Sequence, residues 1–135
     1  MWQPVGLFFE QSSNSLLIAN YGANNIVRWV LNDTQWSIVV GDSNGIGGSL
    51  PSLLRGPTDV MLDPMNNIYV VDRSNHRVQF FSVGQSNATT IAGKTGMVGS
   101  NATLLSSPNS ITFDNQLNLY VADWYNYRIQ KFSRY

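Results

Sequence analysis

The stretch YVVDRSNHRVQFF, residues 69–81, decides the fold of this chain, because a close copy returns 51 positions later as YVADWYNYRIQKF, residues 120–132. Both copies keep one aspartate and one arginine at the same spacing. The histidine, which is the only one in the chain, is not kept, since Tyr127 stands at the position of His76. A group that recurs without its histidine is typical of repeated architecture, so we predict no catalytic residue in it.

Self-similarity extends over the whole chain with a period of about fifty residues. Within each unit, short segments rich in Val, Ile, Leu and aromatic residues alternate with clusters of Asn, Gly, Asp and Ser, as in a meander of antiparallel strands. We predict one domain over residues 1–135, with four strands in each of the first two units and three in the last. The repeats, each opened by a proline, are residues 4–56, 57–107 and 108–135. In the middle repeat the predicted strands are residues 58–62, 67–71, 77–82 and 88–92.

The second predicted strand of each unit is apolar on both of its alternating faces, which predicts sheets that are covered on both sides. In the third strand, Val78 and Phe81 are three positions apart and cannot share one face of a regular strand, so we expect a β-bulge or a strong twist there. Gly-rich connections of about fifteen residues follow the fourth strands, long enough to cross from one sheet to the next. Four-stranded sheets arranged radially satisfy these observations.

A proline, an apolar strand, NIYVVD and then NHRVQF together resemble the NHL repeat, which forms one blade of a β-propeller. NLYVAD followed by NYRIQKF is similar to the same repeat. The resemblance implies an all-β propeller of four-stranded antiparallel blades, of which about 2.75 are present. It also implies a structural role for His76, since the family commonly has histidine at that turn. The first unit departs from the pattern, with Asn20 at the aspartate position and Asn25 at the arginine position.

The recurring acid and arginine have a physical explanation that involves no reaction. An aspartate that ends a strand, as Asp72 and Asp123 are predicted to do, can accept hydrogen bonds from backbone N–H groups of the following turn. Arg77 and Arg128, five residues later, can pair with that carboxylate. Asn20 can replace the acid more weakly. We therefore predict structural corners at these positions.

Other motifs that suggest chemistry do not meet the requirements of that chemistry. Residues 88–95, ATTIAGKT, are similar to a phosphate-binding loop but lack its first glycine and a following helix. The acids of the predicted inner strands are Asp59, Asp63 and Asp114. We predict that Asp63 and Asp114 cap turns, because they repeat one position at the end of a blade. The sequence predicts neither a metal site nor a cofactor.

Composition limits the classes of partner. Eight basic and eight acidic residues give a formal net charge of zero, so no basic field attracts nucleic acid or an anionic membrane surface. No apolar run approaches the ~20 residues of a membrane span, and no signal peptide is visible. Cysteine is absent from the sequence, which excludes disulfides but leaves the compartment open. N-x-T motifs in predicted loops, at Asn32, Asn87 and Asn101, are possible glycosylation sites and favour an extracellular setting slightly.

Strand direction alternates in a meander, so the loops after the second and fourth strands emerge on one face. Exposed Trp, Tyr and Arg side chains on rigidly held loops are typical of interaction surfaces. The alternative is that these aromatic side chains pack on a neighbouring blade. The candidate binding residues on this face are Tyr21, Arg73, His76, Trp124, Tyr125 and Tyr127.

We predict a non-enzymatic scaffold that binds a protein or a small ligand through this face. The resemblance also extends to propeller enzymes, so the alternative is part of a metal-dependent lyase or hydrolase whose catalytic residues lie in other blades. Three blades leave a propeller ring open, and the last blade ends on an unpaired strand. We therefore expect either a longer propeller or self-association, for example two chains that together make six blades.

Overall fold

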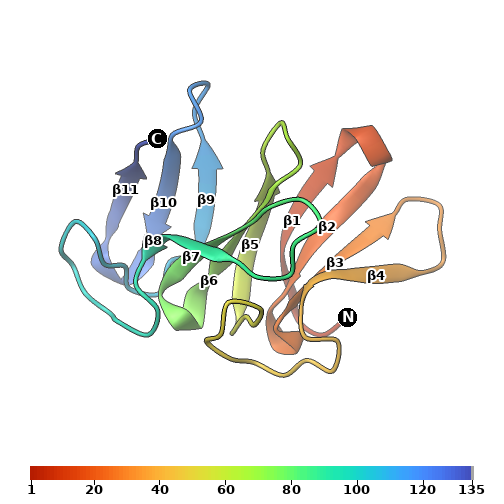
Figure 1. Ribbon diagram of the computed structural model, residues 1–135, viewed down its shortest axis with the longest axis horizontal. Helices are drawn as coiled ribbons and strands as arrows, with labels where there is room; N and C mark the ends of the chain where they lie inside the picture. Colours follow the sequence, from red (N-terminus) through yellow and green to blue (C-terminus); the bar gives the residue numbers. More distant parts are fainter. Residues whose placement is uncertain (135) are drawn as a thin grey trace.

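The computed structural model describes residues 1–134, which form three antiparallel sheets joined by turns and short 3-10 helices (Figure 1). None of the helices in these residues is long and apolar enough to cross a membrane. The first sheet holds β1 (Pro4–Glu10), β2 (Ser15–Asn20), β3 (Asn25–Val30) and β4 (Trp36–Gly41). The second holds β5 (Pro57–Leu62), β6 (Ile68–Asp72), β7 (Arg77–Phe81) and β8 (Thr89–Gly93), and the third holds β9 (Ser110–Phe113), β10 (Leu119–Asp123) and β11 (Arg128–Phe132). The helices are η1 (Gln11–Ser13), η2 (Tyr21–Ala23), η3 (Arg73–Asn75) and η4 (Trp124–Asn126).

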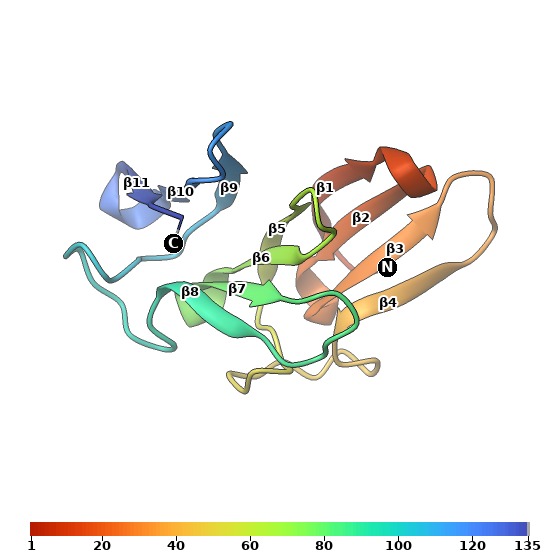
Figure 2. The ribbon, with the colours of Figure 1, turned by 45° about the horizontal axis from the view of Figure 1, so that its top comes forward.

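The sheets stand side by side as blades, which we number 1 to 3 along the chain (Figures 1 and 2). Strands that are neighbours in each blade are also neighbours in the chain. The first strand of blade 2, β5, contacts β1 and β2 of blade 1 on one side and β9 of blade 3 on the other. The predicted fold is confirmed: an all-β propeller arrangement of four-stranded blades, the last of which has three strands within the described residues.

Two apolar clusters fill the spaces between the blades. The first lies between blades 1 and 2 and includes Leu17, Val70 and Phe81, and the second lies between blades 2 and 3 and includes Val71 and Val78. Val70 and Val71 are consecutive and fully buried in different clusters, so blade 2 is covered on both faces, as the sequence predicts. Burying each such side chain stabilises the fold by about 1.5–3 kcal/mol.

The bulge expected in the third strand is not present in β7. Val78 and Phe81 face opposite sides of this strand, whose pairing with β6 is regular, and a different cluster covers each side. The irregularity lies in β8, where the register with β7 passes over Ile91, and at the same position in β4, where it passes over Val39. Two apolar residues three positions apart thus indicate a strand that is buried on both faces.

Residues 42–56 and 94–109 cross from the outer strand of one blade to the inner strand of the next, as predicted. Each crossing buries one leucine between two blades: Leu54 in the first cluster and Leu105 in the second. Both leucines are fully buried. The crossings therefore belong to the core, although they contain no regular strand.

Blades 1 and 3 each keep one face open. On blade 1, Val5, Leu7 and Phe9 of β1 are exposed. On blade 3, Ile129 is 68% exposed, whereas Val78 at the same position of blade 2 is fully buried. A neighbouring blade would cover such faces. Covering by further blades or by a second copy of the chain stays a prediction.

Candidate functional site

Three turns lie at the lower ends of the blades in Figure 1, where the second strand of each blade ends. They are η2, η3 and η4, and with the residue that follows each they form the surface that we call the loop face. Because each turn follows a second strand, the alternating direction of antiparallel strands brings all three to one end of the blades. The predicted residues therefore share one face.

Asp72 ends β6 and is fully buried at the base of η3. Its Oδ1 accepts the N–H of Arg55 at 2.7 Å, and its Oδ2 accepts hydrogen bonds from Asn75 Nδ2 at 2.8 Å and Arg77 Nε at 2.7 Å. Burial raises the pKa of the Asp72 carboxyl, and these three hydrogen bonds offset part of that rise. Both oxygens are thus engaged with the protein itself.

The guanidinium of Arg77 joins the corner of blade 2 to the crossing that precedes it. Its Nη atoms donate to the carbonyl oxygens of Ser49, Leu50 and Leu53 and to the hydroxyl of Thr95, at 2.8–3.3 Å. Arginine suits this position because its planar fork carries five N–H donors. The side chain is only 2% exposed.

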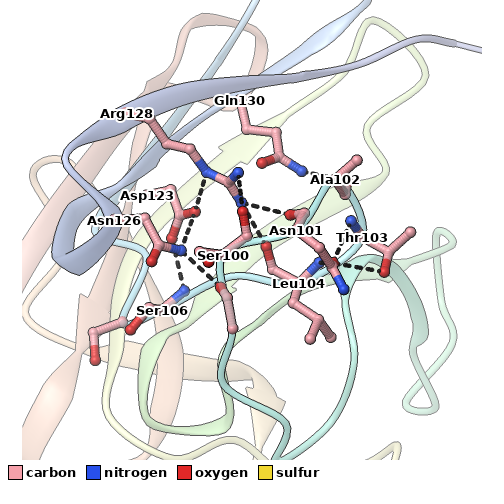
Figure 3. Close-up of polar contacts among 12 residues, drawn as sticks. Ser100, Asn101, Ala102, Thr103, Leu104, Ser106, Asp123, Asn126, Arg128 and Gln130 are labelled. Carbon is pink, nitrogen blue, oxygen red and sulfur yellow. Dashed lines mark hydrogen bonds and ion pairs between the residues drawn. The ribbon is translucent and has the colours of Figure 1, made fainter.

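Figure 3 shows the same arrangement in blade 3. Asp123 Oδ1 accepts the N–H of Ser106 at 2.7 Å, and Oδ2 accepts from Asn126 Nδ2 at 2.7 Å and Arg128 Nε at 2.8 Å. The Nη atoms of Arg128 donate to carbonyl oxygens of crossing residues 100–104 at 2.7–2.8 Å. The corner is therefore rebuilt in a blade for which residues 1–134 supply three strands.

The backbone donors to these two carboxylates differ from the sequence prediction. The prediction places them in the following turn, whereas the donating N–H groups, those of Arg55 and Ser106, precede their aspartates by 17 residues. The N–H of His76 stays within its turn and donates to the carbonyl oxygen of Arg73 at 3.0 Å, whereas the N–H of Ser74 donates to the carbonyl oxygen of Arg55 in the crossing at 3.1 Å. The carboxylate and a turn N–H thus hold the crossing together.

Blade 1 keeps the corner without its charges. Asn20 Oδ1 accepts the N–H of Trp2 at 2.7 Å, and Asn20 Nδ2 donates to Asn25 Oδ1 at 3.2 Å. Asn25 Nδ2 donates in turn to the carbonyl oxygen of Asp42 at 3.2 Å. An amide pair stands where the other blades have an ion pair.

His76 braces the main chain of the next blade. Its Nδ1 accepts the N–H of Ser107, just before the proline that opens blade 3, at 3.0 Å. Asn24 does the same one blade earlier, where its Oδ1 accepts the N–H of Gly56 at 2.9 Å. Both residues adopt the left-handed conformation, with φ of 56° and 54°. The contact requires a side-chain acceptor, which accounts for histidine and asparagine at this position.

The aromatic residues of the loop face divide into exposed and packed ones. Trp124 is 51% exposed and stacks on Tyr125, with ring centroids 5.3 Å apart, and the guanidinium carbon of Arg73 lies 4.4 Å from its ring centroid. Tyr127 is almost fully exposed. Tyr21 is half-buried and packs against the crossing that leads into blade 2.

The acids near the inner strands take part in turns and strand contacts. Asp114 accepts the N–H groups of Gln116 and Asn118, both at 2.9 Å, and the hydrogen bonds from Asn118 lower the pKa of Asp114 to about 2. Asp63 caps the equivalent turn of blade 2, and Asp59 accepts a backbone N–H of β9 at 3.0 Å. Within residues 1–134, no three His, Cys, Asp or Glu side chains lie close enough to hold a metal ion.

Sequence reasoning missed Asn75 and Asn126. While each donates to the aspartate of its corner, its Nδ2 also donates to a crossing carbonyl oxygen, that of Gly48 at 2.8 Å or Gly99 at 2.7 Å. The signal was available, because the same asparagine recurs 51 positions later beside the variable histidine position.

Two other sequence motifs lie outside the loop-face turns themselves. Residues 88–95 form β8 and its flanks, and a crossing follows them. The three N-x-T asparagines, Asn32, Asn87 and Asn101, are exposed in loops, and their glycosylation stays a prediction.

Comparison with known proteins agrees with the repeat. The model of the NHL repeat matches residues 54–81 and 105–132, which contain the corners of blades 2 and 3. No curated protein matches the chain.

Several solved structures share the fold. An auxiliary nutrient binding protein from Bacteroides thetaiotaomicron VPI-5482 is 22% identical, with a TM-score of 0.77, over 96% of this chain and 37% of that one. A gluconolactonase from Xanthomonas campestris is 11% identical, with a TM-score of 0.66, over 91% of this chain and 35% of that one. A virginiamycin B lyase from Staphylococcus aureus is 14% identical, with a TM-score of 0.61, over 97% of this chain and 41% of that one. The chain spans well under half the length of these proteins.

The family match and the structural likeness agree on the architecture. The matched stretches begin in the crossings, at the leucine that each buries between two blades, and end with the third strand. The repeated Asp–Arg corner lies inside both matches. The chain therefore carries two NHL repeats, within a β-propeller fold.

Proposed function

We propose that the chain is a non-enzymatic propeller scaffold that recognises a protein or a small ligand through the loop face. The observation that carries this proposal is the cluster of Trp124, Tyr125 and Arg73, in which both aromatic side chains are exposed and which stands on two braced corners. Trp, Tyr and Arg are the residues most enriched at the centres of binding interfaces. Their stacking fixes their relative positions before a partner arrives, which lowers the entropy cost of binding.

The contacts of the motif residues support a structural role for them. Both carboxylate oxygens of Asp72 and of Asp123 accept hydrogen bonds from the protein, and so does His76 Nδ1. A catalytic acid, base or nucleophile must instead reach the proton or atom on which it acts. The large exposed side chains of the loop face, those of Trp124, Tyr125 and Tyr127, are aromatic, which suits a role in binding.

The chemistry of the cluster indicates the kind of partner. The stacked rings of Trp124 and Tyr125 offer a flat apolar surface, and Arg73 places a positive charge at its border. This combination suits a flat or apolar group that has a carboxylate or hydroxyl group beside it. The similarity to a nutrient binding protein also supports the proposal that the chain binds a ligand.

Trp124→Ala tests the proposal, with Trp36→Ala as its matched control. Trp36 is 44% exposed and begins β4 of blade 1, so it lies two blades away from Trp124 of blade 3. The probe is a panel of monosaccharides and acidic dipeptides, screened against the ¹⁵N-labelled chain by NMR with the indole N–H signals as reporters. We expect the panel members that bind to shift the indole N–H signal of Trp124. Their affinity for Trp124→Ala should be at least tenfold weaker than for the unsubstituted chain, whereas their affinity for Trp36→Ala should be unchanged. Binders that shift Trp36 instead, or that bind both variants equally, would contradict the proposal.

A second candidate, part of a propeller enzyme, is favoured by the likeness to a gluconolactonase and a lyase. In this reading the chain supplies scaffold, and the catalytic groups lie in other blades. Metal analysis of the protein purified with all of its natural flanking residues separates the two candidates. Stoichiometric zinc or calcium that chelation removes together with lyase or lactonase activity would favour the enzyme.

A further inference from the structure

A cleft of about 520 Å³ lies between blades 1 and 2, where the loop that joins β7 to β8 lies beside β3 and β4 (Figures 1 and 2). Both blades have four strands, so the described residues supply both walls of the cleft. Val39 and Ile68 form apolar parts of the walls, and Arg28, Asn66 and Gln85 form polar parts. Ligand sites usually enclose ~300–1,000 Å³ and combine apolar surface with a few polar groups. This cleft therefore has the size and the lining of a binding site.

The equivalent space between blades 2 and 3 is smaller and more apolar. It measures about 240 Å³, and its walls include the aromatic side chains of Tyr69, Phe80 and Phe113. Arg28 stands at the position of Phe80, because each is the fourth residue of the third strand in its blade. A guanidinium therefore lines one cleft where an aromatic ring lines the other.

The ion pair of Arg28 has a structural equivalent in blade 2. Nη2 of Arg28 lies 3.0 Å from Oε2 of Glu10, the last residue of β1. The corresponding acid of blade 2, Asp63, accepts the hydroxyl of Tyr69 at 3.1 Å. Leu17 stands at the tyrosine position in blade 1, and the donor comes from β3 instead. One hydroxyl donor is enough for this acid in blade 2, so the contact alone does not require an arginine with its five N–H donors.

The guanidinium of Arg28 keeps donors that the described residues do not use. Arg77 and Arg128 donate hydrogen bonds from Nε and from both Nη atoms. Within residues 1–134, by contrast, Nε of Arg28 is buried and has no hydrogen-bond partner. A buried donor without a partner is rare in native proteins, and a bound water, ion or ligand is a common reason for one. The Arg28 side chain is 32% exposed, so a molecule in the cleft can reach its guanidinium.

Glu10 holds this guanidinium at the cleft. Its Oε2 also accepts hydrogen bonds from the hydroxyl groups of Ser13 and Ser15, and its side chain is buried. Burial raises the pKa of the Glu10 carboxyl, but the hydrogen bonds from both serines and the charge of Arg28 outweigh this and bring the pKa below its ordinary value of 4.5. Because Glu10 is ionised, an anionic ligand competes with it for Arg28.

We infer that this cleft binds a small hydroxylated carboxylate of the sugar-acid class. The ligand carboxylate accepts hydrogen bonds from the guanidinium of Arg28, whose planar fork suits a carboxylate. The ligand hydroxyl groups bond to the side-chain amides of Asn66 and Gln85, and the apolar face of the sugar ring packs on Val39 and Ile68. The loops that line the cleft follow first and third strands, so it lies at the end of the blades opposite to the loop face. The inference does not rest on the function proposed for the loop face.

The test uses the protein purified with all of its natural flanking residues, D-glucuronate as the probe and neutral D-glucose as the matched ligand. Titration calorimetry measures the affinity, and NMR of the ¹⁵N-labelled protein follows the Nε–H signal of Arg28. We expect D-glucuronate to shift this signal and to bind at least tenfold more tightly than D-glucose. Arg28→Met should weaken D-glucuronate binding at least tenfold, whereas Arg73→Met, the matched control on the loop face, should leave it unchanged.

Glu10→Gln is a second variant that decides the question even where Arg28→Met does not fold. It keeps an oxygen that accepts from Ser13 and Ser15 and removes the charge that competes for Arg28, so D-glucuronate should bind several-fold more tightly. An unchanged or weaker affinity in Glu10→Gln would overturn the inference, because the structural contact alone predicts no gain.

Three further results would also overturn it. Equal binding of D-glucose and D-glucuronate would show that the ligand carboxylate is not recognised. Loss of D-glucuronate binding in Arg73→Met would assign the ligand to the loop face. The third is the absence of saturable binding at millimolar D-glucuronate.

Discussion

Blades 2 and 3 contain the same thirteen-residue motif in different surroundings. Their Asp–Arg pairs are nearly identical in geometry, with Nε to Oδ2 distances of 2.7 and 2.8 Å. Arg77 is 2% exposed, however, whereas Arg128 is 28% exposed. The corner thus forms from the hairpin and the crossing before it, and its burial comes from the fourth strand and the next blade.

The difference in exposure between Arg77 and Arg128 distinguishes the contacts that the motif itself makes from the burial that neighbouring strands provide. The motif specifies the turn, the ion pair and the hydrogen bonds to the crossing. The neighbours remove water, which strengthens these interactions and makes the loss of one partner more costly. Equivalent substitutions should therefore lower the free energy of unfolding more in blade 2, where the corner is more buried, than in blade 3.

The largest expected difference is between Asp72→Ala and Asp123→Ala. Asp72→Ala leaves the buried Arg77 without its counter-charge, and we expect the free energy of unfolding to fall by about 3–5 kcal/mol. Asp123→Ala leaves Arg128 able to reach water, so the loss is about 1–3 kcal/mol. Urea unfolding followed by tryptophan fluorescence measures both, and equal losses would contradict the comparison.

The next difference concerns one apolar position. Val78→Ala removes two methyl groups from a fully buried site and should lower the free energy of unfolding by about 2 kcal/mol. Ile129→Ala alters the equivalent position of blade 3, where the side chain is exposed. It should change the free energy of unfolding by less than about 0.5 kcal/mol. A large cost for Ile129→Ala would show that this face is covered in solution, and sedimentation would then reveal whether a second copy covers it.

Gly93→Ala measures how tightly the fourth strand of blade 2 fits its corner. Gly84→Ala is the control, because Gly84 has nearly the same φ, +74° against +76°, but nothing within 4 Å of an added Cβ. We expect Gly84→Ala to cost about 1 kcal/mol through backbone strain alone. Gly93→Ala should cost about 1–2 kcal/mol more, because its Cβ meets the His76 carbonyl oxygen. Equal thermal unfolding midpoints for the two variants would refute the close fit.

The smallest expected effect is the pH dependence contributed by Asp114. The pKa of Asp114 is lowered from its ordinary value of 3.8 to about 2 by hydrogen bonds, those from Asn118 first. Its stabilising contribution is therefore complete above pH 3.8 and is lost as the pH falls from 3.8 toward 2. Asp114→Asn should lose less stability than the wild type over this range, and parallel acid-unfolding curves would contradict this assignment.

Sequence periodicity was sufficient to predict the strands and their grouping. The first strand of blade 2 was predicted at residues 58–62 and runs over Pro57–Leu62, because apolar residues between turn residues leave little freedom in its limits. The Asp72–Arg77 pair was also predictable, since a spacing of five residues across a tight turn places the two opposite each other in β6 and β7.

The partners outside the hairpin were not predictable. Arg55 and Ser106 donate to the aspartates from crossings whose path depends on how two blades pack, and that path has no periodic signal. The spacing of apolar residues predicts a bulge in β7, whereas the extra residue lies in β8, because burial on both faces and an extra residue produce the same spacing. The sequence likewise does not predict that Ile129 is exposed, because the residues around Ile129 are nearly the same as those around the buried Val78.

The central claim is that the repeated aspartate holds the crossing to its blade. Native-state amide hydrogen exchange of Asp123→Ala tests it most directly, because this variant changes the corner of blade 3 and leaves that of blade 2 intact. The account predicts that the Ser106 amide loses its protection while the Arg55 amide, held by Asp72, keeps its own. Unchanged protection at Ser106, or equal loss at both amides, would contradict it.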